Sequence, residues 1–124
     1  MPVIPTANTK KFDIPTAQFT ACAAPSTGAT ETSAWRVTVK AKSEGLAHQL
    51  TREEIILVLS GSATAQIGQE QHQVSEGDTL IVPAFVDFTL SNPNDRDFTA
   101  IAILPVGGQA IIGGEAPFIP PWAA

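Results

Sequence analysis

The stretch HQLTREEIILVLSG, residues 48–61, decides how the rest of the sequence is interpreted. It begins with a histidine, a residue type that can bind a metal or carry a proton, and it ends at Gly61, which suits a tight turn. Between them, Ile55 to Leu59 form an apolar run that is too short for a typical helix and rich in β-branched residues. The run predicts a β-strand that is buried on both faces.

Short segments of the same kind surround this strand. WRVTVKA, SATAQIG and FTAIAILP alternate apolar and polar residues, and turn signals such as Ser43-Glu44-Gly45 and Asn92-Pro93-Asn94 separate the segments. The 124 residues include 10 prolines and 9 glycines, and 44% of them are hydrophobic. This pattern predicts one all-β domain, either a sandwich or a small barrel.

Composition divides the chain into three parts. Residues 1–34 are rich in Pro, Thr, Ala and Ser and hold two short strand candidates, KKFDI and QFTACA, so we expect an N-terminal arm. Residues 35–105 contain the regular strands and form the expected barrel core. Residues 106–124 carry two Gly-Gly pairs and a Pro-Pro pair, which predict an irregular tail. Trp122 in this tail is expected to pack on the barrel or on a partner subunit.

Charge and composition also exclude some partners. The net charge is -5, and the seven basic residues form no block beyond Lys10-Lys11, so no nucleic-acid partner is expected. No stretch approaches the roughly 18 to 20 apolar residues of a membrane span, so no membrane partner is expected either. The single cysteine, Cys22, is compatible with a reducing compartment and with a place in the core. These features predict a soluble, cytoplasmic protein.

A first motif runs from His48 to Gly61. The pattern His48-x-Leu50-x(3)-Glu54-x(6)-Gly61 resembles the first motif of the cupin superfamily, Gly-x(5)-His-x-His-x(3 or 4)-Glu-x(6)-Gly. The spacing agrees throughout, although Lys42 stands where the family has its first glycine.

A second motif runs from Gly77 to Asn92. The pattern Gly77-x(5)-Pro83-x-Phe85-x(2)-Phe88-x(3)-Asn92 resembles the second cupin motif, Gly-x(5)-Pro-x-Gly-x(2)-His-x(3)-Asn, with Phe85 in place of the inner glycine. The resemblance covers residues 35–105. It implies the cupin double-stranded β-helix, a jelly-roll barrel, with the N-terminal arm and the irregular C-terminal tail added to it.

The same resemblance implies a metal site that has lost half of its ligands. In the family, three histidines and a glutamate face the barrel lumen and hold a divalent metal, and by position these are His48, Leu50, Glu54 and Phe88 here. Leucine and phenylalanine offer a cation no lone pair, whereas a catalytic transition metal normally has three or four protein ligands. We therefore predict no cofactor. If a divalent metal binds after all, His48 and Glu54 are its expected ligands.

No other residue is a convincing third ligand. His72 lies in the polar segment QEQHQV and reads as a surface histidine. Glu53 and Asp87 are next to site residues, so in an extended strand each would point to the opposite face.

The two replacements make the lumen apolar. Alternation along the strands adds Ile56, Val58 and Leu90 to the wall that Leu50 and Phe88 form. Such a pocket suits a largely hydrophobic small molecule, held in orientation by one or two polar groups.

The surviving polar pair could transfer protons. A carboxyl in an apolar pocket has a raised pKa, a nearby imidazolium would lower it, and either case permits proton transfer near neutral pH. We predict a metal-independent acid/base enzyme of the isomerase, cyclase or dehydratase type that uses Glu54 and His48. Arg52, in the turn between them, could bind a carboxylate of the ligand. A non-catalytic binding or sensing protein is the first alternative, and a dioxygenase-like metal-dependent cupin is the second.

Similar small cupins commonly form dimers, so the resemblance also implies a homodimer. The arm at residues 1–34 and the apolar tail with Phe118 and Trp122 offer surfaces for the contact.

Overall fold

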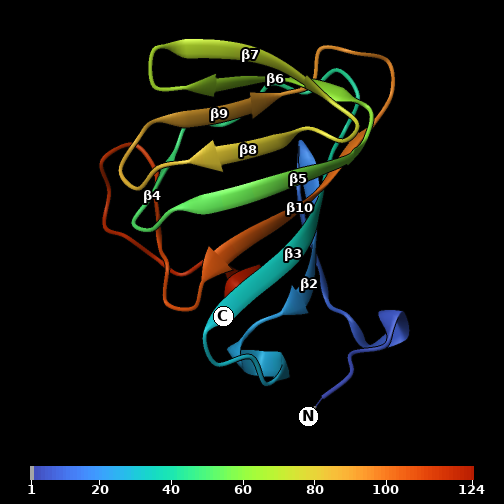
Figure 1. The fold of residues 1–124 in the computed structure, drawn as a ribbon, viewed down its shortest axis with the longest axis vertical. Coiled ribbons are helices and arrows are strands. Elements are labelled where there is room, and N and C mark those ends of the chain that lie inside the picture. Colours follow the sequence, from blue (N-terminus) through green and yellow to red (C-terminus); the bar gives the residue numbers. More distant parts are fainter. Residues whose placement is uncertain (1) are drawn as a thin grey trace.

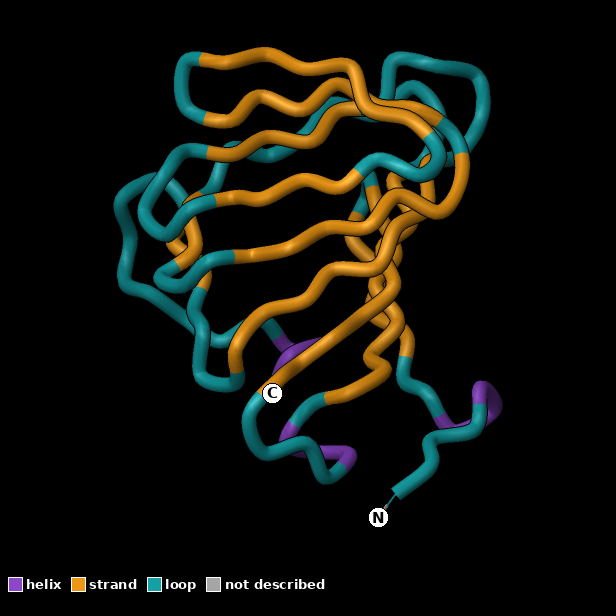
Figure 2. Tube along the Cα trace, viewed as in Figure 1, coloured by secondary structure: helices purple, strands orange, loops and turns teal. Residues whose placement is uncertain are grey.

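A computed structural model describes residues 2–124 and consists almost entirely of β-strands. The strands are β1 Lys11–Ile14, β2 Ala17–Ala23, β3 Thr32–Val39, β4 Gln49–Leu50, β5 Glu54–Ser60, β6 Ser62–Ile67, β7 Glu70–Ser75, β8 Thr79–Val82, β9 Phe88–Ser91, β10 Phe98–Pro105 and β11 Ala110–Ile111. Short 3-10 helices lie at η1 Thr6–Asn8, η2 Pro25–Thr27 and η3 Pro121–Ala123. The all-β prediction is confirmed, as the strand segments of Figure 2 make plain.

The strands form two layers (Figure 1). A six-stranded sheet has the order β1-β2-β3-β10-β5-β8, and a three-stranded sheet has the order β7-β6-β9. Isolated bridges from His48 to Phe88 and from Ser43 to Asn92 attach the segment before β4 to β9, and β4 pairs with β11. The second layer therefore continues as β7-β6-β9-β4-β11. Buried side chains of both layers form one core, and we call the interior between the layers the lumen.

Strand β5 is buried on one face only. Glu54, Ile56 and Val58 are buried, whereas Leu57 and Leu59 are each 38% exposed. The prediction of burial on both faces was wrong, because no element of residues 2–124 covers the outer face of the six-stranded sheet at this strand. An apolar run shows that a strand is hydrophobic but not which of its faces the chain itself will cover.

Asn92, the last residue of the second motif, holds the fold together from inside. It is completely buried, and its side-chain amide donates hydrogen bonds to the carbonyl oxygens of Val39 (3.1 Å) and Arg96 (2.7 Å). Its side-chain oxygen accepts a bond from the backbone N–H of Asn94 (3.0 Å). Asn92 thus fixes the loop after β9 to the end of β3, and its polar atoms are all used within the protein.

Motif positions that the family fills with glycine have left-handed backbone here as well. Gly61 has φ 78°, and a Cβ added to it would lie 2.5 Å from the carbonyl oxygen of Asp97. Lys42 and Phe85, the two residues in place of family glycines, have φ 57° and φ 61°. Non-glycine residues in this region carry a steric cost of about 1–2 kcal/mol. The backbone at Lys42 and Phe85 is therefore left-handed, a conformation that favours glycine, although neither residue is glycine.

The N-terminal strands and the C-terminal tail pack on each other. β1 and β2 extend the six-stranded sheet beyond β3, and the Trp122 ring stacks on Phe19 with centroids 3.7 Å apart and an interplanar angle of 3°. The tail also contains order that its composition did not predict: β11 pairs with β4, and Phe118 forms a bridge with Ala110. These pairings are too short to leave an alternating pattern in the sequence.

Among residues 2–124 there is no helix of the length and apolar character that a membrane crossing requires.

Candidate functional site

Four motif residues, His48, Leu50, Glu54 and Phe88, lie in or next to the ends of β4, β5 and β9, and β4 is at the left of Figure 1. Glu54 is the first residue of β5, and it pairs with Val82, the last residue of β8. Phe88 is the first residue of β9, and it pairs with His48 just before β4. The ends of these four strands belong to both motifs.

Glu54 is a buried carboxyl without a hydrogen-bond partner. It is 4% exposed, and its side chain accepts no hydrogen bond from any of residues 2–124. Burial removes the carboxylate from water and raises the pKa of Glu54 from its ordinary value of 4.5 to about 8. At neutral pH the group is therefore mostly protonated, so it is equipped first of all to donate a proton.

The Glu54 carboxyl still has access to a small amount of free space. Every fully enclosed side-chain oxygen or nitrogen in residues 2–124 has a hydrogen-bond partner. Since the carboxyl oxygens have none, they must touch space that a water-sized probe can reach. A small molecule entering the lumen could therefore contact them.

His48 lies at the rim of the lumen with one ring nitrogen fixed. Its Nδ1 is 2.9 Å from the carbonyl oxygen of Leu46, which can only accept, so Nδ1 carries a hydrogen. In the neutral ring, Nε2 then holds the free lone pair. His48 and Phe88 exchange two backbone hydrogen bonds (3.0 and 2.8 Å), an arrangement that puts both side chains on the same side of the sheet. The two rings meet edge to face with centroids 5.5 Å apart.

The donor set does not fit a divalent metal. Leu50 (4% exposed) and Phe88 (3% exposed) occupy two of the four positions that hold the metal in the family. No group of three or more His, Cys, Asp or Glu side chains within residues 2–124 is arranged to hold a metal ion. The remaining pair, His48 and Glu54, offers fewer ligands than the three or four protein ligands that a catalytic metal normally has.

The predicted wall residues have different surroundings. Ile56 (3% exposed) and Val58 (5% exposed) lie in the core with Leu50 and Phe88, and Leu90 is half-buried against it. Arg52 is exposed in the turn between β4 and β5.

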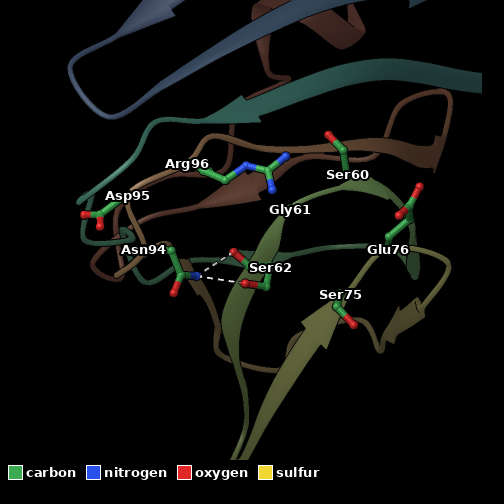
Figure 3. Close-up of a pocket in the computed structure, with 8 residues that line it drawn as sticks. All are labelled: Ser60, Gly61, Ser62, Ser75, Glu76, Asn94, Asp95 and Arg96. Atoms are coloured by element: carbon green, nitrogen blue, oxygen red, sulfur yellow. Dashed lines mark hydrogen bonds between the residues drawn. The ribbon is translucent and has the colours of Figure 1, made fainter.

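Two of the cavities formed by residues 2–124 lie away from the candidate site, and neither of these two is lined by Glu54 or His48. The larger, about 720 Å³, is at the far end of β5, where Ser60 and neighbouring loops form a polar hollow (Figure 3). There the Asn94 amide donates to the hydroxyl and carbonyl oxygens of Ser62, both at 3.0 Å. Asp95 points away toward Lys42, with which it forms an ion pair at 3.0 Å.

The smaller cavity, about 390 Å³, lies between β7 and β8 and is largely apolar on its inner side. Ala65, Val74 and Leu80, which are buried core residues, form part of its wall, and His72 stands beside them. Sequence reasoning missed this site. The signal was the alternation of β7, which gives His72 the same side of the strand as Val74.

Comparisons with known proteins agree with the fold. The Cupin domain family matches residues 35–104. No curated protein matches the chain. The polyketide cyclase RemF from Streptomyces resistomycificus has a similar structure, with a TM-score of 0.79 and 13% identity over 94% of this chain and 87% of that one. KdgF from Halomonas sp. has a TM-score of 0.72 and 19% identity over 84% and 94% of the two chains.

A salicylate 1,2-dioxygenase from Pseudoaminobacter salicylatoxidans, solved in complex with gentisate, has a TM-score of 0.71 and 16% identity over 82% of this chain and 30% of that one. At such identities the likeness extends to the fold alone. The family match, in contrast, covers more than half of the 124 residues. The chain therefore belongs to the cupin domain family.

Proposed function

We propose that this cupin is a small-molecule enzyme in which the protonated carboxyl of Glu54 donates a proton inside an apolar lumen. The observation that carries the proposal is a carboxyl that is 4% exposed, lacks a hydrogen-bond partner among residues 2–124 and has its pKa raised to about 8 by burial. A buried group of this kind lowers stability, and strongly shifted pKa values gather at functional sites.

The chemistry suits isomerisation, cyclisation or dehydration. In an isomerisation, Glu54 gives its proton to the carbonyl oxygen of an activated substrate, and an adjacent C–H bond loses its proton to a base. The free Nε2 lone pair of His48 is one such base, and the newly formed Glu54 carboxylate is another. The base then returns its proton to a different carbon, and the oxygen-bound proton goes back to Glu54. The carbonyl group is thereby re-formed, both side chains regain their starting states, and the net charge is unchanged. Proton transfer by a placed side chain contributes roughly 10² to 10⁴ in rate, which is enough for β-keto or polyenyl compounds.

The polyketide cyclase of similar structure supports the cyclase variant of this proposal. The support is limited to the shared fold, so the assignment to Glu54 depends on the site itself.

The experiment compares two neighbouring glutamates. Glu54→Gln keeps the shape of the side chain and removes the acid, whereas Glu53→Gln changes an exposed residue one position away. Turnover of a panel of β-keto and polyenyl compounds should fall by roughly 10² to 10⁴ in Glu54→Gln and stay unchanged in Glu53→Gln. Equal turnover in both variants and the wild type would contradict the proposal.

A non-catalytic binding protein is the second candidate, and one observation favours it: neither cavity is lined by Glu54 or His48. A binding protein would change only in ligand affinity in Glu54→Gln, and none of the panel would be turned over. The dioxygenase-like alternative lacks support from the donor set. Stoichiometric Fe(II), Mn(II) or Zn(II) that survives dialysis would favour it.

The proposal includes a homodimer and a cytoplasmic location. Leu57, Leu59 and Ile81 are exposed on the outer face of β5 and β8, and a second copy of the chain would cover them. Sedimentation should give about twice the 13.0 kDa of one chain, and Leu57→Asp should shift the species toward the monomer.

The unpaired thiol of Cys22 supports a reducing compartment, and recovery of the chain from the periplasm would contradict this.

A further inference from the structure

His72 is on the lumen side of β7, although its sequence context reads as surface. It pairs with Ala65, which is completely buried, and residues directly opposite each other in an antiparallel pair share one side of the sheet. Val74, two residues along, is 8% exposed on that same side. The His72 side chain is nevertheless 49% exposed, because β7 is the last strand of its sheet.

A cavity of about 390 Å³ lies where His72 stands, between two strands that each end a sheet. β7 is the edge of the second layer and β8 is the edge of the six-stranded sheet, so no strand of residues 2–124 closes the gap between them. The inner wall consists of Ala65, Val74 and Leu80 with the half-buried Ile67. The cavity is thus a side opening between the layers, and we call it the side cavity.

The polar groups of the side cavity are few and lie at its outer end. Asp78 accepts a hydrogen bond from the backbone N–H of Ser75 (2.8 Å) through one carboxylate oxygen, and its other oxygen forms no bond with residues 2–124. The Gln73 amide is occupied by Thr64 (3.0 Å). The His72 ring is 3.7 Å from Glu70, a long contact between exposed groups. Thr79 also lines the cavity, but it pairs with Leu57 of the outer face. His72 and Asp78 are therefore the polar groups of the inner side that a ligand could meet.

Residues on the inner wall of the side cavity pair directly with residues of the candidate site or with their neighbours. Ile67 pairs with Phe88, which in turn pairs with His48. Leu80 pairs with Ile56, and the next inward residue of β8 pairs with Glu54. A ligand in the side cavity would therefore lie beside the apolar side chains that surround the carboxyl.

We propose that the side cavity binds a neutral, largely apolar molecule that carries a hydroxyl group. This molecule enters the lumen between β7 and β8 with its hydroxyl group at His72 and Asp78. The volume is within the range of small-molecule sites and suits about one or two fused rings. The hydroxyl donates to the ring nitrogen or the free carboxylate oxygen. Asp78 and Glu70 at the rim, and the net charge of -5, disfavour an anionic ligand. As an entry route for a substrate, this inference rests on the proposed function.

The test adds 2-naphthol to the protein and follows the chemical shifts of its methyl groups and histidine rings in two-dimensional carbon–proton correlation NMR spectra. We expect saturable binding, with ring-current shifts at the Ala65 methyl group and at the His72 ring. His72→Ala should weaken binding about five-fold or more, the effect of one lost hydrogen bond, whereas Gln71→Ala on the opposite side of the same strand should leave it unchanged. The anion 2-naphthoate should bind more weakly than 2-naphthol. Neither variant disturbs a buried residue, since both positions are exposed.

Three results would overturn the proposal that the side cavity binds this ligand. They are the absence of a shift at Ala65 at the solubility limit of 2-naphthol, shifts centred on Leu50 and Phe88 instead, and an equal loss of 2-naphthol affinity in His72→Ala and Gln71→Ala. The Glu54→Gln variant separates this inference from the proposed function. If that variant binds 2-naphthol normally while no compound is turned over by the wild type, the side cavity stands and the enzymatic proposal fails. If turnover depends on Glu54 but 2-naphthol leaves the Ala65 signal unshifted, the enzymatic proposal stands and the side-cavity proposal fails.

Discussion

Glu54 and Asn92 are both buried polar residues of cupin motifs, yet they lie at opposite ends of the lumen in opposite circumstances. Asn92 is completely buried, and its three hydrogen bonds join the loop after β9 to the rest of the fold. Glu54 is 4% exposed, and its side chain forms no hydrogen bond with any of residues 2–124. A satisfied buried amide stabilises a fold, whereas an unsatisfied carboxyl destabilises it once ionised. A structural role explains why Asn92 is buried, whereas no structural role explains the buried carboxyl of Glu54.

The largest expected effect is on the pH dependence of stability at Glu54. Its pKa in the folded state, about 8, lies above its ordinary value of 4.5, so between these values the folded state binds more protons than the unfolded state. The contribution of Glu54 to stability should therefore be greatest below about pH 4.5 and be lost as pH rises through about 8, by an amount on the order of 5 kcal/mol. Glu54→Gln should remove this loss. Urea unfolding of both proteins at about pH 5 and pH 9 measures it.

Glu53→Gln is the matched control, because it removes an exposed carboxyl next to the buried one. The expectation for Glu54 is contradicted if wild type, Glu54→Gln and Glu53→Gln all lose the same free energy of unfolding between the two pH values. Glu54 would then differ from Asn92 in no pH-dependent way.

A smaller, pH-independent effect is expected at Asn92. Asn92→Ala removes both amide bonds and leaves the carbonyl oxygens of Val39 and Arg96 without that donor, so the free energy of unfolding should fall by about 2–3 kcal/mol. Asn94→Ala, whose amide bonds only Ser62, should cost about 1 kcal/mol. Urea unfolding at about pH 5 and pH 9 checks both. A strong pH dependence of the Asn92→Ala loss would mean that this residue, too, is coupled to a titrating group.

The smallest effect is a gain in stability at the left-handed positions. Phe85 has φ 61° and is 60% exposed, so Phe85→Gly relieves backbone strain and removes few contacts. Because glycine also increases the entropy of the unfolded chain, the net gain should be about 0.5–1 kcal/mol. Phe85→Ala keeps a Cβ and should show no such gain. Thermal unfolding of the two variants compares them, and a loss of stability in Phe85→Gly would mean that the ring itself stabilises the loop.

The sequence predicts the regular part of the fold well. Strands such as β3 and β10 have long alternating patterns, and the motif spacings indicate the cupin domain family that matches residues 35–104. β4 and β11 were missed because two residues carry no period. The exposed outer face of β5 was missed as well, since an apolar run does not reveal whether another layer covers it.

The chemistry of the site was less predictable. The motif left open whether Glu54 would be ionised, because its pKa depends on burial and on bonds that only the packed lumen fixes. The side of β7 on which His72 lies depends on its register with β6. Its cavity depends on the gap between two sheet edges, and no local pattern encodes the width of that gap.

The central claim is that Glu54 holds a proton at neutral pH, and carbon-13 NMR of the glutamate side-chain carboxyls tests it directly. The other glutamates of residues 2–124 are exposed, so the Glu54 signal should stand apart in a titration from about pH 4 to pH 10, and it should be absent in Glu54→Gln. A midpoint near 8 is expected for this signal. A midpoint near the ordinary value of 4.5 would contradict it.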